Sequence, residues 1–88
     1  MYLEKIKSAY DNPTYPYAHN NALVGLEGIL KEYKMEPEVK KELTNYHEQI
    51  SKTSFYNPWT CKIDETKFRE FNYLIYDLFH YLKRFTFS

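Results

Sequence analysis

Apolar residues recur every three or four positions along most of the chain, the spacing that places them on one face of an α-helix. The pattern predicts a short helix at about residues 2–10 and two longer helices at about 20–34 and 37–53. A fourth helix follows Asp64, whose side chain suits the N-cap position. The sequence shows no sustained alternation of the kind that marks strands. We therefore expect an all-α fold: a compact small helical bundle of three long helices and one short N-terminal helix, in a single domain over residues 1–88.

Only Met35 and Glu36 separate the second predicted helix from Pro37, a residue suited to the first helical position. Such a short joint predicts that the second and third helices are antiparallel neighbours. Within the second helix, Gly25 and Gly28 provide a flank without side chains. We expect a bulky ring or another helix to pack against that flank.

Two loops combine proline with aromatic residues: 12–17 and 55–59. Proline and the Asn-Pro pair in each loop interrupt the helical pattern. We expect Phe55 and Trp59 to cap the core, while rigid aromatic rings on loops are also what protein interfaces prefer. Tyr56 and Trp59 are therefore counted among the candidate binding residues.

The fourth predicted helix has two contrasting faces when its residues are placed at 100° intervals. One face is apolar and holds Phe68, Phe71, Leu74, Ile75, Leu78, Phe79, Leu82 and Phe85. The other carries tyrosines and mixed charges: Arg69, Tyr73, Tyr76, Asp77, His80, Lys83 and Arg84. Tyrosine and arginine are enriched at binding hot spots, so we interpret this face as a partner-binding surface anchored by Tyr73 and Tyr76. The alternative is that other helices cover the whole helix and bury His80 in a polar cluster.

Composition sharpens this picture through its aromatic content and its charge. Ten tyrosines, six phenylalanines and one tryptophan make up 19% of the 88 residues, more than a core of this size needs. Basic and acidic residues balance to a net charge of zero, which disfavours binding to duplex nucleic acid because that affinity comes largely from basic side chains. The chain shows neither a signal-peptide pattern nor an apolar run long enough for a membrane span. We expect a soluble cytoplasmic protein.

The residue types that carry chemistry are few and scattered. His19, His47, His80 and Cys61 fall on four different predicted elements and lack the spacing of metal-ligand motifs. We therefore expect no metal, no cofactor and no catalytic residue, with Cys61 a lone thiol packed beside aromatic rings. A small enzyme or metal protein built on His47, His80 and Cys61 is the less favoured alternative.

These features together predict a small non-catalytic protein that inhibits or neutralises a larger partner by covering part of it. The partner is expected to be another protein, such as a toxin or a target enzyme, or a second copy of the chain. The size and predicted architecture are similar to those of small helical bacteriocin-immunity proteins, and a phage-encoded inhibitor is an equivalent case. The candidate partner-binding residues are Arg69, Tyr73, Tyr76, Asp77, His80, Arg84, Tyr56 and Trp59. Two alternatives stay open: an aromatic module that stacks single-stranded nucleic acid or nucleotides, and a homodimeric structural or regulatory helical protein.

Overall fold

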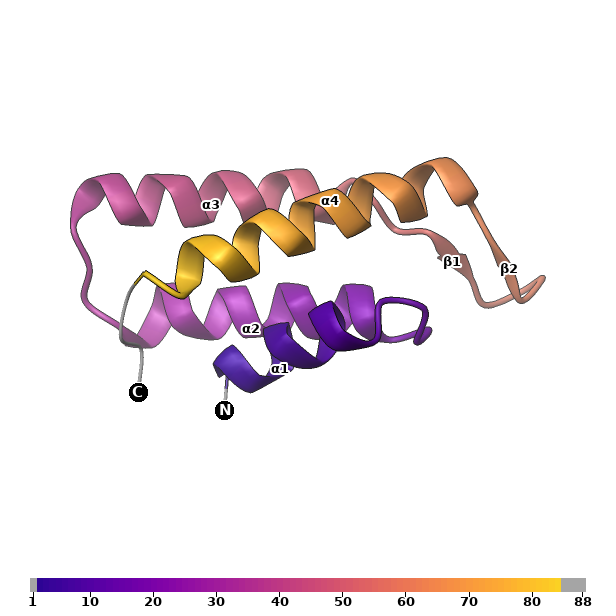
Figure 1. Cartoon of the computed structure of the whole chain (residues 1–88), viewed down its shortest axis with the longest axis horizontal. Helices are drawn as coiled ribbons and strands as arrows, with labels where there is room; N and C mark the ends of the chain where they lie inside the picture. Colours follow the sequence, from indigo (N-terminus) through magenta and orange to yellow (C-terminus); the bar gives the residue numbers. More distant parts are fainter. Residues whose placement is uncertain (1, 85–88) are drawn as a thin grey trace.

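The computed structural model describes residues 2–84, which form a four-helix bundle. The helices are α1 (Tyr2–Asp11), α2 (Ala18–Glu32), α3 (Pro37–Ser51) and α4 (Glu65–Leu82), and their directions alternate along the chain (Figure 1). Helix α1 packs against α2 and α4, and α3 packs against the same two helices. The molecule measures 41 × 21 × 19 Å. The all-α fold class, the short first helix and the antiparallel α2–α3 pair are confirmed.

A single apolar core runs through the bundle and takes residues from all four helices. Its fully buried members include Ile6, Ala22, Leu26, Ile29, Leu43, Ile50, Phe55, Phe71, Ile75, Leu78 and Leu82. The predicted apolar face of α4 is the face that points into this core. Phe68 and Leu74, at its margins, are half-buried, and Phe85 lies outside the described residues.

Helix α1 lies against the two glycines of α2. A methyl group on Gly25 would come within 2.7 Å of the Tyr2 backbone oxygen and 2.8 Å of Ile6 Cγ1. A methyl group on Gly28 would overlap the Tyr2 ring itself. The expectation that a ring and a helix pack on this flank is confirmed, and the glycines set how closely α1 approaches α2.

A short β-hairpin, which the sequence pattern did not predict, joins α3 to α4. Strand β1 (Tyr56–Asn57) pairs antiparallel with β2 (Lys62–Ile63). The Asn57 side-chain oxygen accepts hydrogen bonds from the backbone N–H groups of Trp59 (2.9 Å) and Thr60 (3.4 Å). The Cys61 N–H donates to the Asn57 backbone oxygen (2.8 Å), and Cys61 adopts a positive φ of 56°. Two-residue strands are too short to leave an alternation in the sequence, and the turn chemistry of Asn57 and Pro58 is what defines the hairpin.

Replacing Cys61 by glycine is expected to stabilise the protein by about 1 kcal/mol, because an L-residue in the left-handed region carries a strain that glycine lacks. Cys61→Ala keeps the strain and removes only the thiol, so it is the matched control. Urea unfolding of the wild type and both variants measures the difference. Equal stability of the glycine and alanine variants would show that the backbone conformation at Cys61 is not strained.

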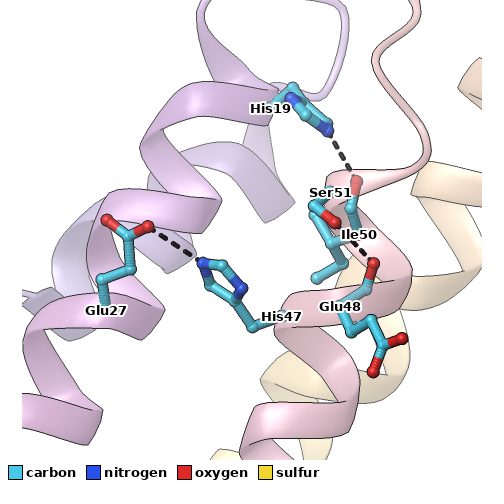
Figure 2. Close-up of polar contacts among 6 residues, drawn as sticks. All are labelled: His19, Glu27, His47, Glu48, Ile50 and Ser51. Carbon is cyan, nitrogen blue, oxygen red and sulfur yellow. Dashed lines mark hydrogen bonds and ion pairs between the residues drawn. The ribbon is translucent and has the colours of Figure 1, made fainter.

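Two polar contacts tie α2 to α3 (Figure 2). The His19 Nε2–H donates to the backbone oxygen of Ile50 at 2.6 Å, because a carbonyl oxygen can only accept. His47 Nε2 lies 3.0 Å from Glu27 Oε1. The Ile50 oxygen also accepts from the Thr53 hydroxyl (2.7 Å) and the Thr53 N–H (2.9 Å), so the end of α3 is held by several donors. The His19 and Thr53 contacts lie at the hairpin end of the bundle and hold α2 to the last turn of α3 there.

His19 makes the stability of the bundle depend on pH. Burial lowers the pKa of His19 below its ordinary value, and the hydrogen bond to Ile50 offsets part of that lowering. The unfolded chain therefore binds more protons than the folded chain in weakly acidic solution, so stability rises with pH in that window. The free energy of unfolding is expected to be largest above about pH 6.5 and to decrease as the pH falls through that value.

The variant His19→Gln isolates this effect, because glutamine retains an N–H donor and does not titrate. Urea unfolding at neutral pH and at about pH 5.5 should show a smaller loss of stability in the variant than in the wild type. Carboxylates protonate mainly below this window and are common to both proteins. An identical pH dependence in the two proteins would assign the titration to other groups.

Candidate functional site

The outward side of α4 is open to solvent. Five candidate residues on this helix are exposed, namely Arg69, Tyr73, Tyr76, Asp77 and His80, and so is Arg84, two residues beyond its C-terminal end. The Tyr73 side chain is 69% exposed and that of Tyr76 is 54% exposed. The alternative that other helices cover α4 on all sides is therefore wrong. We call these six residues the α4 face.

A groove of about 700 Å³ runs beside the α4 face, between α4 and the end of α1. It is lined by Tyr10, Asp11, Asn72, Tyr73, Ile75, Tyr76 and Asp77. Ile75 is buried and contributes an apolar floor. The contribution of α1 was not predicted, because the candidate binding residues came only from the fourth predicted helix and the 55–59 loop. Tyr10 is half-buried, so one part of its ring belongs to the core and another part to the groove.

The aromatic rings beside the groove contact one another. Tyr10 stacks on Phe79 with centroids 4.5 Å apart and planes inclined by 26°. The His80 ring lies 4.3 Å from the Tyr76 ring and meets the edge of Tyr10 at 5.9 Å. The Lys83 ammonium lies 4.9 Å from the centroid of Phe79, within the range of a cation–π interaction. These contacts restrain the rings of Tyr10 and Tyr76.

Tyr73 separates this groove from a second, smaller hollow on the α3 side of α4. That hollow measures about 380 Å³ and is lined by Gln49, Lys52, Thr53, Glu70, Tyr73 and Leu74. No other ring within the described residues contacts Tyr73. The ring thus forms an isolated ridge with a hollow on either side.

Two carboxylates line the groove, and only one of them is paired within the described chain. Asp11 Oδ2 accepts a hydrogen bond from the Lys7 ammonium at 2.7 Å. Asp77 makes no hydrogen bond or ion pair with any residue of the described chain. None of the groove-lining residues is basic. Burial raises the pKa of Tyr46 on α3 and that of Tyr81, the Asp77 carboxylate adds to the rise at Tyr46, and Arg84 opposes both rises. Asp77 and Arg84 therefore both act on Tyr46.

Two predicted site residues, Tyr56 and Trp59, lie on the hairpin and not beside the α4 face. The hairpin stands beyond the N-terminal end of α4 (Figure 1), and its own shallow hollow shares no residue with the groove. Trp59 is 92% exposed, so the expectation that it caps the core is wrong. The Asn57 hydrogen bonds fix the loop so that the indole points outward. Phe55, by contrast, is buried in the core as expected.

The two proline-aromatic loops meet at this end of the bundle. The pKa of Tyr56 is raised chiefly by a hydrogen bond with the Cys61 thiol, and Tyr17 of the first loop contributes to the same rise. The Tyr15 and Tyr17 rings pack edge to face at 5.5 Å. Alternating helix directions place the first and third connections at the same end of a four-helix bundle, which is the signal that could have predicted this meeting.

The residues considered for catalysis or metal binding do not converge. Over residues 2–84, no three His, Cys, Asp or Glu side chains are grouped so as to hold a metal ion. His19 and His47 are engaged between α2 and α3, and His80 stacks on Tyr76. Cys61 is exposed at the hairpin, beside Tyr56. Within the same described range, no helix is long and apolar enough to cross a membrane.

Comparison with known proteins gives no relative from which a function could be transferred. No protein-family model, curated protein or solved structure matches the chain. The role of the α4 face must therefore be inferred from its own residues and geometry.

Proposed function

We propose that this chain is a small non-catalytic binding protein that uses the α4 face to cover a surface of a larger protein partner. Blocking a partner in this way requires a stable scaffold and a complementary face, and it requires no reacting group. Immunity proteins and protein inhibitors of enzymes act on this principle. The exposure of Tyr73 and Tyr76 beside the α1–α4 groove is the observation that carries the proposal.

The energetics favour a binding role for these two rings. Covering an exposed tyrosine ring contributes on the order of 2–3 kcal/mol from removal of apolar surface. Neither ring is needed to fill the core, which is already occupied by residues such as Phe71 and Leu78. Tyrosine also orders few rotatable bonds when it binds, so little of that gain is lost to entropy.

Preorganisation of the groove walls also favours binding. The contacts of Tyr10 with Phe79, and of Tyr76 with His80, fix two walls of the groove in the free protein. A surface that is already in its binding shape loses less conformational freedom on association than a mobile one. The mixed charges around the tyrosines supply specificity for one partner over others.

Affinity capture from extracts of the native host, or of an organism that competes with it, tests the proposal. Wild-type protein and Trp59→Ala should retain one stoichiometric protein partner, and Tyr73→Ala should not. Trp59→Ala is the matched control because it removes an exposed aromatic ring from the hairpin. Circular dichroism of each variant confirms that the helices remain folded.

The opposite pattern, capture by Tyr73→Ala and loss in Trp59→Ala, would place the binding surface on the hairpin and refute the proposal. If the retained partner is a second copy of the chain, sedimentation of the purified protein will show a dimer that Tyr73→Ala dissociates. That outcome would mean that the α4 face serves self-association and does not inhibit a foreign partner.

A further inference from the structure

Resting on the proposed function, we propose further that the α1–α4 groove receives an arginine side chain of the partner protein. The partner segment is then an arginine flanked by apolar residues. The guanidinium lies against the tyrosine rings and pairs with Asp77, while the apolar neighbours cover Tyr73 and the groove margins.

The first argument is the charge of Asp77. Its carboxylate lines the groove and has no hydrogen bond or ion pair with residues 2–84. A partner that covers Tyr73 and Tyr76 also takes Asp77 out of water, because all three line one groove. A carboxylate that loses its water and gains no partner opposes binding strongly. We therefore expect the bound protein to supply hydrogen-bond donors at this point, and a cation supplies the strongest ones.

The second argument is that no cation within residues 2–84 forms an ion pair with Asp77. No lysine or arginine lines the groove. Lys7 binds the other carboxylate of the groove, Asp11, at 2.7 Å. Arg84 acts on Tyr46 as Asp77 does, but the two form no ion pair in the described chain. His80 faces the Tyr76 ring at 4.3 Å and does not contact Asp77 in the hydrogen bonds or ion pairs of the described chain. The groove thus contains one carboxylate, that of Asp77, that has no cationic partner within the described chain.

The third argument selects arginine over lysine. The groove places three tyrosine rings, Tyr10, Tyr73 and Tyr76, around an apolar floor at Ile75. A planar guanidinium stacks on aromatic faces and binds a carboxylate through two parallel hydrogen bonds, whereas an ammonium is a compact and strongly hydrated point charge. Aromatic walls beside a carboxylate therefore suit the guanidinium better.

Nuclear magnetic resonance titration with small probes tests this directly. N-acetyl-L-arginine amide should cause saturable shifts in the backbone amide signals of Asn72, Tyr73 and Asp77. N-acetyl-L-citrulline amide has the same shape and planar end group without the charge, so it loses the ion pair and the cation–π attraction and should bind at least about fivefold more weakly. Equal shifts with citrulline, or arginine shifts spread over the whole surface, would overturn the proposal.

Two matched variants complete the test. Asp77→Asn removes the charge with almost no change in shape and should weaken arginine binding about fivefold, the value of a solvent-accessible ion pair. Glu70→Gln makes the same charge change on the same helix outside the groove and should leave binding unchanged. If both variants bind arginine as the wild type does, Asp77 is not the counterion and the proposal is wrong.

Failure of this proposal is separable from failure of the proposed function. If Asp77→Asn retains the protein partner as strongly as wild type while Tyr73→Ala loses it, the α4 face binds a partner and the arginine assignment falls. If Tyr73→Ala also retains the partner, the arginine proposal and the proposed function are both refuted.

Discussion

Phe71→Ala is expected to lower the free energy of unfolding by about 3–5 kcal/mol. Phe71 lies on the inward side of α4 and is completely buried. Its ring centroid lies 5.2 Å from that of Phe55 and 5.7 Å from that of His19, so truncation leaves a cavity where α4, α2 and the hairpin segment meet. A domain of this size is stabilised by about 5–15 kcal/mol in total, so the variant loses a large part of its margin.

Urea unfolding followed by circular dichroism measures this loss, with Tyr73→Ala as the matched control. Tyr73 is an aromatic residue two positions away on the same helix. Removal of its exposed ring should change the free energy of unfolding by less than about 0.5 kcal/mol. Similar losses in the two variants would mean that α4 does not divide into a core side and a free side.

Tyr73→Ala and Tyr76→Ala are each expected to weaken binding of the protein partner by about 30-fold or more, which corresponds to about 2 kcal/mol or more. Both rings border the α1–α4 groove and are exposed in the free protein. Their removal takes away the largest apolar contacts that the α4 face can offer. The melting temperature should change by only a few degrees, because neither ring fills the core.

Titration calorimetry with the purified partner checks the affinities. Lys41→Ala changes an exposed residue of α3 and should bind as the wild type does. Tyr76→Ala also removes the ring contacts with His80 and Tyr10, so a small loss of stability in this variant accompanies the loss of binding. Wild-type affinity in both tyrosine variants would refute the assignment of the α4 face.

The helices were predictable because burial leaves a periodic trace in the sequence. The apolar positions of α4 point inward as their spacing indicates, and the Asp64 side chain accepts the Lys67 N–H at 3.1 Å as an N-cap should. Helix α2 begins at Ala18, two residues earlier than predicted, without a side-chain cap to mark its start. The hairpin escaped prediction because its short strands leave no periodic trace.

The site was predictable only where it lies on one helix. Placing residues at 100° intervals identified the exposed side of α4. The contribution of Tyr10 depends on how α1 packs across α4, which single-helix periodicity does not encode. The exposure of Trp59 depends on the turn that Asn57 and Cys61 build. Helical periodicity does not describe this turn, so we predicted a buried indole, whereas the indole points outward.

The central claim, that the outward side of α4 contacts a protein partner, is tested most directly by photo-crosslinking. p-Benzoyl-phenylalanine replaces Tyr73 in one variant and Lys41 in another, and both are irradiated in the extract from which the wild-type protein captures its partner. The claim predicts a single protein adduct from the residue 73 variant and none from the residue 41 variant. Adducts from position 41 alone, or none from position 73 while the wild-type protein captures its partner, would contradict it.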